Sequence, residues 1–189
     1  MVDVGWAYWF STEPIYTPDD LKNNKIFIWA GDYKSAQLYE KHGYQPVPLA
    51  MTDVLSGLQT DLITSLGFNP LYALAQQLFG IADNMLDMKW GVLMAGIVMD
   101  LKTWNRIPKK YHTELIQITR SIQDKYKKTN QKAEQDAIDA MKKFGLTIHQ
   151  INEPDMQLWK SEVERVSIYL RGNIITESIY DTVIRLTNK

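Results

Sequence analysis

Residues 17–70 contain short apolar runs that alternate with amphipathic segments of helical character. The runs are Lys-Ile-Phe-Ile-Trp at 25–29 and Val-Pro-Leu at 47–49, and a third is expected at 61–66. A chain that alternates strands with helices typically folds as a mostly parallel sheet flanked by helices. We therefore predict an α/β fold in which these three runs share one mostly parallel sheet.

Composition excludes several kinds of protein. The chain has 189 residues, is 45% hydrophobic, carries a formal net charge of −1 and contains no cysteine. It therefore has no disulfide framework and no thiol nucleophile, and no basic field for binding nucleic acid is expected. The residues after Met1 lack the charged and apolar regions of a signal peptide. No apolar run approaches the ~20 residues that a membrane span needs.

Two further segments predict strands. Segment 2–10 is rich in aromatic residues, which favours a strand. Because chain termini are usually polar and frayed, two interpretations stay open: an edge strand covered by a helix, or a strand of a chain that continues upstream. Segment 85–99 predicts a strand, a bend near Gly91 and a second strand that join two bodies. A buried helix would have the same apolar content.

The clearest single element is a helix at 108–144. Its apolar residues recur in steps of three, four or seven along one stripe. At ~1.5 Å per residue it would be on the order of 55 Å long, which is more than one small domain needs. We expect it to pass 128–130 without a break and to span two lobes. A short strand at 146–151 and helices at 152–170 and 173–186 follow.

Catalytic signatures are mostly missing from the sequence. There is no Gly-rich phosphate loop and no nucleophile elbow. His42, His112 and His149 lie on separate expected elements, at spacings that no metal motif uses. We expect His42 to stand at a helix end, where it supports the helix dipole. The sequence therefore predicts no catalytic residue, no metal site and no cofactor.

Large apolar side chains gather instead at the expected strand ends. Each alone is more typical of a core than of a site. Together they would suit an apolar ligand cleft with a few polar anchors. The residues are Trp6, Tyr8, Phe27, Trp29, Met51 and Trp90.

The order of these segments resembles the solute-binding proteins of TRAP transporters, the DctP-like family. The resemblance covers nearly the whole chain and rests on several short motifs in sequence. They are Thr-Pro-Asp-Asp-Leu-Lys at 17–22, the strands at 25–29 and 47–49, the helix at 52–59 with its Leu-Gln pair, Asn69-Pro70, the segment 104–108 before the long helix, and Glu153-Pro154.

The resemblance implies a periplasmic-binding-protein-like lobe with a long lobe-spanning helix. Residues 1–100 would form the α/β ligand-binding lobe with crossing strands, and 101–189 the long helix and C-terminal helices that complete the lobes. The family's first lobe would lie largely upstream of Val2. The protein would be a periplasmic or extracytoplasmic receptor, not an enzyme. It would bind a small solute between two lobes and deliver it to TRAP membrane subunits.

Two departures from the family pattern bear on the ligand. The family usually has an arginine where Phe27 stands and often a second where Ala7 stands, and these arginines pair with a ligand carboxylate. We therefore expect a more apolar or zwitterionic solute. An arginine-less receptor would also suit the family variant that works with a tetratricopeptide-repeat partner. The expected ligand-binding residues are Phe27, Trp29, Met51, Asn69, Tyr8 and Trp90.

Two alternatives from other classes stay open. One is an α/β enzyme domain with an unrecognised site, and the other is a helical interaction module built on the long helix. The first needs a titratable group beside a base or metal, and the second needs an exposed apolar stripe on that helix.

Overall fold

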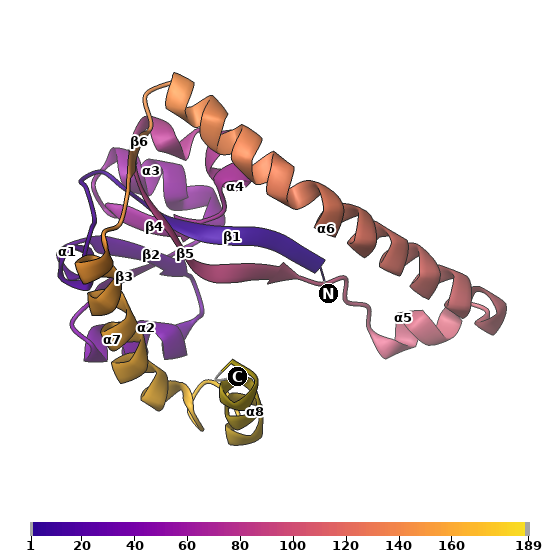
Figure 1. Ribbon diagram of the computed structural model, residues 1–189. Coiled ribbons are helices and arrows are strands. Elements are labelled where there is room, and N and C mark those ends of the chain that lie inside the picture. The colour runs from indigo at the N-terminus through magenta and orange to yellow at the C-terminus, as the bar shows by residue number, and fades with distance from the viewer. Residues whose placement is uncertain (1, 188–189) are drawn as a thin grey trace.

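The computed structural model describes residues 2–187 as a sheet with helices on both faces and one long helix that extends away from it (Figure 1). Among these residues the sheet has six strands in the order β3-β2-β4-β1-β5-β6. They are β1 (Val2–Ser11), β2 (Lys25–Trp29), β3 (Gln45–Leu49), β4 (Ser65–Phe68), β5 (Asn84–Ala95) and β6 (Thr147–His149).

The pairing pattern confirms the predicted α/β class. β2 is parallel to both β3 and β4, and β5 is parallel to β6. β1 is antiparallel to its two neighbours, β4 and β5. Helices connect the strands, as parallel pairing requires. They are α1 (Pro18–Lys22), α2 (Tyr33–Lys41), α3 (Val54–Gln59), α4 (Pro70–Ala75), α5 (Leu101–Arg106), α6 (His112–Lys143), α7 (Glu153–Leu170) and α8 (Glu177–Thr187).

Two apolar cores lie on opposite faces of the sheet. One contains Phe10 of β1 together with Leu58 of α3 and Met141 of α6. The other contains Trp9 of β1, Leu21 of α1 and Trp159 of α7. Because successive strand residues point to opposite faces, Trp9 and Phe10 bury one large ring in each core.

β1 lies in the interior of the sheet, so the edge-strand interpretation of 2–10 is wrong. Along residues 7–11 both faces of the strand are covered, and Tyr8, Trp9 and Phe10 are all buried. A strand buried on both faces has a continuous apolar run rather than a clean alternation. This explains why the alternation in the sequence is imperfect.

The third predicted strand exists, but its bounds are wrong. It spans Ser65–Phe68 rather than 61–66. Asp61 has a left-handed backbone with φ of 54°, and the amide of Ile63 donates to the carbonyl of Gly57. Residues 61–64 therefore form the turn that enters β4.

β5 is a single strand, and the buried-helix interpretation of this segment is wrong. The register between β1 and β5 shifts where Ala7 pairs with Gly91 and Trp9 pairs with Leu86. Five steps along β5 therefore match two steps along β1, and the additional residues form a bulge beside Gly91. Bulges of this kind bend a strand, and the predicted bend falls here.

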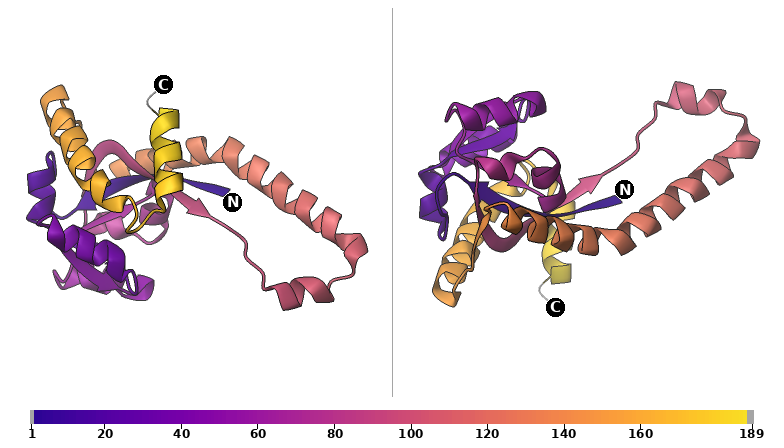
Figure 2. Two further views of the ribbon diagram at one scale, coloured as in Figure 1. Left: turned by 90° about the horizontal axis from the view of Figure 1, so that it is seen from below. Right: turned by 90° about the horizontal axis from the view of Figure 1, so that it is seen from above.

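The long helix is continuous, as predicted. It is preceded by a single 3₁₀ turn (Lys109–Tyr111) and runs unbroken through residues 128–130. Its 32 residues span about 48 Å. Figure 2 shows its C-terminal part against the sheet and its N-terminal part reaching away toward α5. No helix within residues 2–187 is long and apolar enough to cross a membrane.

Candidate functional site

Four aromatic rings pack together at the carboxyl ends of β2 and β4, where α/β sheets place their ligands. Phe27 lies 5.6 Å from Trp29 and 5.6 Å from Phe68, measured between ring centroids. Trp29 is 5.9 Å from Phe68, and Phe68 stacks on Tyr72 of α4 at 4.8 Å. We call Phe27, Trp29, Phe68 and Tyr72 the aromatic wall.

The aromatic wall has a buried base and an exposed edge. Phe27 and Phe68 are buried, whereas the side chain of Trp29 is 52% exposed. Tyr72 is half-buried. Met51 is half-buried as well and packs against the core that contains Phe27. The exposed edge of the aromatic wall is therefore formed by Trp29 and Tyr72.

Tyr8 lies beside the aromatic wall, because it pairs with Phe68 across β1 and β4. Its ring is buried in the same core. The hydroxyl donates a hydrogen bond to Glu134 Oε1 at 2.9 Å. Burial, together with this carboxylate, raises the pKa of Tyr8 well above its ordinary value, so the hydroxyl stays protonated and continues to donate.

Asn69 begins α4 as its N-cap, as the Asn-Pro pair predicts. Its Oδ1 accepts the amide hydrogen of Tyr72 at 2.8 Å, and its Nδ2 donates to the carbonyl oxygen of Val4 at 3.0 Å. The side chain is 5% exposed. Asn69 therefore connects α4 to β1 and fixes the position of Tyr72.

Trp90 lies on the opposite face of the sheet from the other predicted site residues. Its ring stacks on Trp9 at 4.7 Å with an interplanar angle of 12°. It also covers Gly67, where an added Cβ would come within 2.6 Å of Trp90 Cζ2. The structure therefore brings together Phe27, Trp29, Met51, Asn69 and Tyr8 and separates Trp90 from them.

Sequence reasoning missed three residues of this region. Phe68 was missed because the strand was placed too early, although Phe68 is the last residue of β4. Tyr72 was missed although the start of α4 was predicted, because no sequence pattern places its ring beside Phe68. Glu134 was missed because nothing distinguishes it from the other acids on the polar face of the long helix. With the correct bounds of β4, the rule that ligands bind at the carboxyl ends of strands would have identified Phe68.

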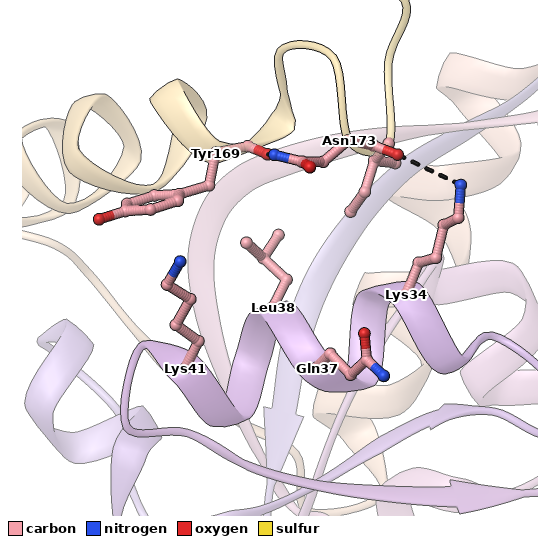
Figure 3. A pocket seen from close by; sticks show the side chains of 7 residues that line it. Lys34, Gln37, Leu38, Lys41, Tyr169 and Asn173 are labelled. Atoms are coloured by element: carbon pink, nitrogen blue, oxygen red, sulfur yellow. Dashed lines mark hydrogen bonds between the residues drawn. The ribbon is translucent and has the colours of Figure 1, made fainter.

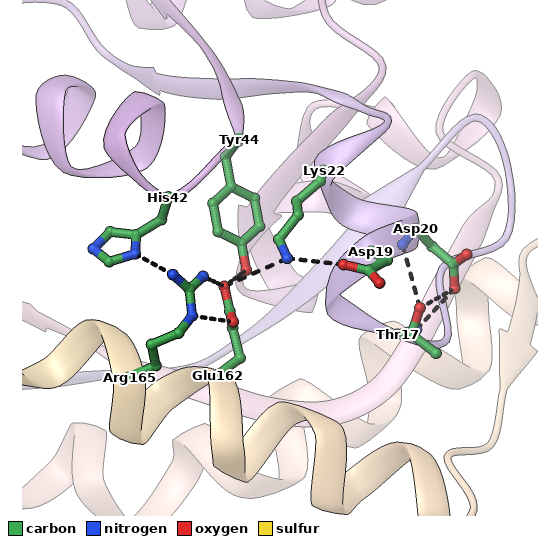
Figure 4. Close-up of polar contacts among 8 residues, drawn as sticks. All are labelled: Thr17, Asp19, Asp20, Lys22, His42, Tyr44, Glu162 and Arg165. Carbon is green, nitrogen blue, oxygen red and sulfur yellow. Dashed lines mark hydrogen bonds and ion pairs between the residues drawn. The ribbon is translucent and has the colours of Figure 1, made fainter.

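A polar cluster connects α7 to the second core (Figure 4). Glu162 accepts hydrogen bonds from the Tyr44 hydroxyl at 2.9 Å and from Arg165 Nη2 at 2.6 Å, and Lys22 lies 3.9 Å away. Arg165 Nη1 donates to His42 Nδ1 at 2.8 Å. Burial alone would raise the pKa of Glu162, but the hydrogen bonds from Arg165 and Tyr44 and the charge of Lys22 together lower it.

His42 is the C-cap of α2, as predicted, but it does not support the helix dipole as a cation, so that part of the expectation is wrong. A guanidinium can only donate, so Nδ1 of His42 is the acceptor and is unprotonated. Burial and the nearby charge of Arg165 lower the pKa of His42. The imidazole is therefore neutral at pH 7.

Two hollows lie beside α7. A groove of about 930 Å³ runs between α7 and the sheet and is lined by apolar side chains that include Trp9, Trp90 and Trp159. A smaller hollow of about 260 Å³ lies between α2 and the end of α7, where Lys34 Nζ donates to the carbonyl oxygen of Asn173 (Figure 3). Within residues 2–187 no group of His, Asp or Glu side chains could hold a metal ion.

The sheet order, the long antiparallel pair β1 and β5 and the long helix define the fold as α/β. Residues 1–170 match the model of DctP, the bacterial extracellular solute-binding protein family 7. The chain belongs to this family.

Solved structures of TRAP periplasmic proteins have the same fold. The ectoine-binding protein of the TeaABC TRAP transporter of Halomonas elongata has a TM-score of 0.80 at 19% identity over 89% of this chain and 56% of its own length. A solute-binding protein of Desulfovibrio salexigens, solved with bound orotic acid, has a TM-score of 0.82 at 13% identity over 98% of this chain and 59% of its own.

Among curated proteins, a solute-binding protein of Sulfitobacter sp. (strain NAS-14.1) is 30% identical over 100 residues. That match covers 52% of this chain and 29% of the relative. The chain therefore matches only part of each of these relatives, and little more than half of the two solved structures.

Proposed function

We propose that this protein is part of an extracytoplasmic receptor that binds a small solute and delivers it to the membrane subunits of a TRAP-type transporter. Family membership supports solute binding over the enzyme and interaction-module alternatives. The observation that carries the proposal is the aromatic wall, which lies at the carboxyl ends of two parallel strands. The solute would lie against Trp29 and Tyr72.

We further propose that the solute has a large apolar part. Phe27 occupies the position where the family resemblance implies an arginine, and its ring packs edge-on against Trp29. A carboxylate placed at this position without a cationic partner would lose several kcal/mol of solvation free energy. An apolar ring or chain would instead bury the exposed half of Trp29, at about 25 cal/mol per Å² of apolar surface removed from water.

The remaining predicted site residues would act in different ways. Met51 and Tyr8 would support the aromatic wall from behind. Asn69 stays a predicted polar anchor, although a solute would have to compete with Val4 for its Nδ2. Trp90, on the opposite face of the sheet, would contact a solute only if that face also lines the site.

We also propose that the chain supplies one side of the solute cleft. Residues 1–100 would form this side and 101–189 would complete it. The support is that the chain spans 56% and 59% of two related binding proteins. Affinity for solute should then be weak in the chain alone.

A tetratricopeptide-repeat partner stays a prediction, since it rests on the absent arginine.

Nuclear magnetic resonance can test the site, because titration detects weak binding. The indole N–H signal of Trp29 should shift with caprolactam or cyclohexanol, which are uncharged and have a large apolar part, and not with succinate. The variant Trp29→Ala should abolish the response of neighbouring amides, whereas Tyr33→Ala, at a residue that is 72% exposed, should preserve it. Shifts caused by succinate alone, or no shift with any probe, would contradict the proposal.

A further inference from the structure

Glu134 lies where α6 leaves the body of the molecule. On its C-terminal side Ala137, Ile138 and Met141 are buried against the sheet. On its N-terminal side the apolar residues Ile122 and Tyr126 are 41% and 53% exposed. Glu134 is therefore close to the last point at which the helix is held.

Both carboxylate oxygens of Glu134 contact β1. Oε2 accepts the backbone amide hydrogen of Trp6 at 3.1 Å, and Oε1 accepts the hydroxyl of Tyr8 at 2.9 Å. Lys89 of β5 lies 3.9 Å from Oε1, and the Glu134 side chain is only 12% exposed. One carboxylate therefore connects α6 to both strands. It is held to β1 by two hydrogen bonds of the stronger, charge-assisted kind and to β5 by the longer ion pair with Lys89.

The backbone of β1 is shaped to receive this carboxylate. Gly5 has φ of +119°, and a Cβ at this position would lie 3.3 Å from Oε2. The register of β1 against β5 also shifts between Asp3 and Gly5. A larger residue would be strained here and would crowd Glu134.

A small change at this point becomes a large displacement at the far end of α6. The 22 residue-to-residue rises from His112 to Glu134 span about 33 Å, so a tilt of ~10° would move the far end by roughly 6 Å. We infer that Glu134 is a positioning residue that sets the direction in which α6 leaves the lobe. The positioning of α6 by Glu134 does not depend on the proposed function. Only a role for this contact in closing lobes around a solute would rest on that function.

Distance measurement by pulsed electron paramagnetic resonance tests this inference directly. The sequence contains no cysteine, so Glu40→Cys in α2 and Arg120→Cys in α6 would be the two labelled positions. Glu134→Ala should broaden and shift the distance distribution. Glu134→Gln, which keeps the shape but not the charge, should give an intermediate result. Asp136→Ala, an exposed acid on the same helix, should leave the distribution unchanged.

Amide hydrogen exchange supplies a second measurement on the same variants. The Trp6 amide loses its acceptor in Glu134→Ala and should exchange roughly tenfold faster or more. A role in stability alone would lower the melting temperature while the distance distribution stays as in the wild type. That result, or equal broadening in Asp136→Ala, would overturn the inference. Neither measurement requires solute. The inference about Glu134 can therefore fail while the proposed function holds, and the reverse is also possible.

Discussion

His42 gives the molecule a pH dependence near neutrality. It is buried at the end of α2 and accepts a hydrogen bond from Arg165. Burial, then the charges of Arg165, Lys41 and Lys22, lower its pKa, and Glu162 opposes them. The unfolded chain, with an ordinary histidine pKa of about 6.5, therefore binds more protons below that pH than the folded chain does.

Stability to urea should thus be constant between about pH 7 and 9 and fall as the pH is lowered from about 6.5 toward 5. In His42→Gln the amide oxygen still accepts from Arg165 but cannot titrate, so this fall should be much smaller. Glu162 also loses stabilising contacts when protonated, but its lowered pKa places that loss at more acidic pH. An equal fall in both proteins would contradict the assignment to His42.

Gly67 allows the close approach of Trp90. In Gly67→Ala the new methyl would lie 2.6 Å from Cζ2 of Trp90, so the ring would have to leave its stack on Trp9. We expect a loss of about 1–3 kcal/mol in unfolding free energy, with a change in the near-ultraviolet circular dichroism of the tryptophan pair. Gly91→Ala, which has nothing within 4 Å of the new Cβ, is the control and should leave both readouts close to wild type.

At the scale of single elements, α6 has two parts with different energetics. Met141 is fully buried in the first core, whereas Ile122 is exposed. Met141→Ala should therefore lower the unfolding free energy by about 2–5 kcal/mol, through lost transfer free energy and a cavity. Ile122→Ala should change it by no more than ~0.5 kcal/mol. Chemical denaturation measures both, and a large loss in Ile122→Ala would show that this half packs on a partner.

Elements with a strong periodic pattern were predictable from the sequence, whereas the turns and boundaries between elements were not. Thr17 caps α1 through a capping box with Asp20, and Asn69 caps α4 as the Asn-Pro pair predicts, because caps depend on neighbouring residues. The start of β4 was predicted too early, because the left-handed turn at Asp61 contains no glycine that would indicate a turn in the sequence.

Long-range placement was harder to predict than local structure. Residues two apart in a strand point to the same side, so Phe27 and Trp29 were expected together, and the structure shows them in contact. Trp90 reaches the opposite face through the bulge in β5, and a bulge has no clear sequence signature. Glu134 lies more than 120 residues from Tyr8 and Trp6 in the sequence, so spacing within a helix could not reveal their contact.

At the scale of the whole molecule, we propose that the arginine-free aromatic wall forms one side of a solute site. Isothermal titration calorimetry of the chain tests this claim most directly, with caprolactam, succinate and malate as solutes. We expect binding weaker than about 1 μM for every solute, with caprolactam preferred over both dicarboxylates and its binding lost in Trp29→Ala. Sub-micromolar binding of succinate or malate, unchanged in Phe27→Ala, would contradict it.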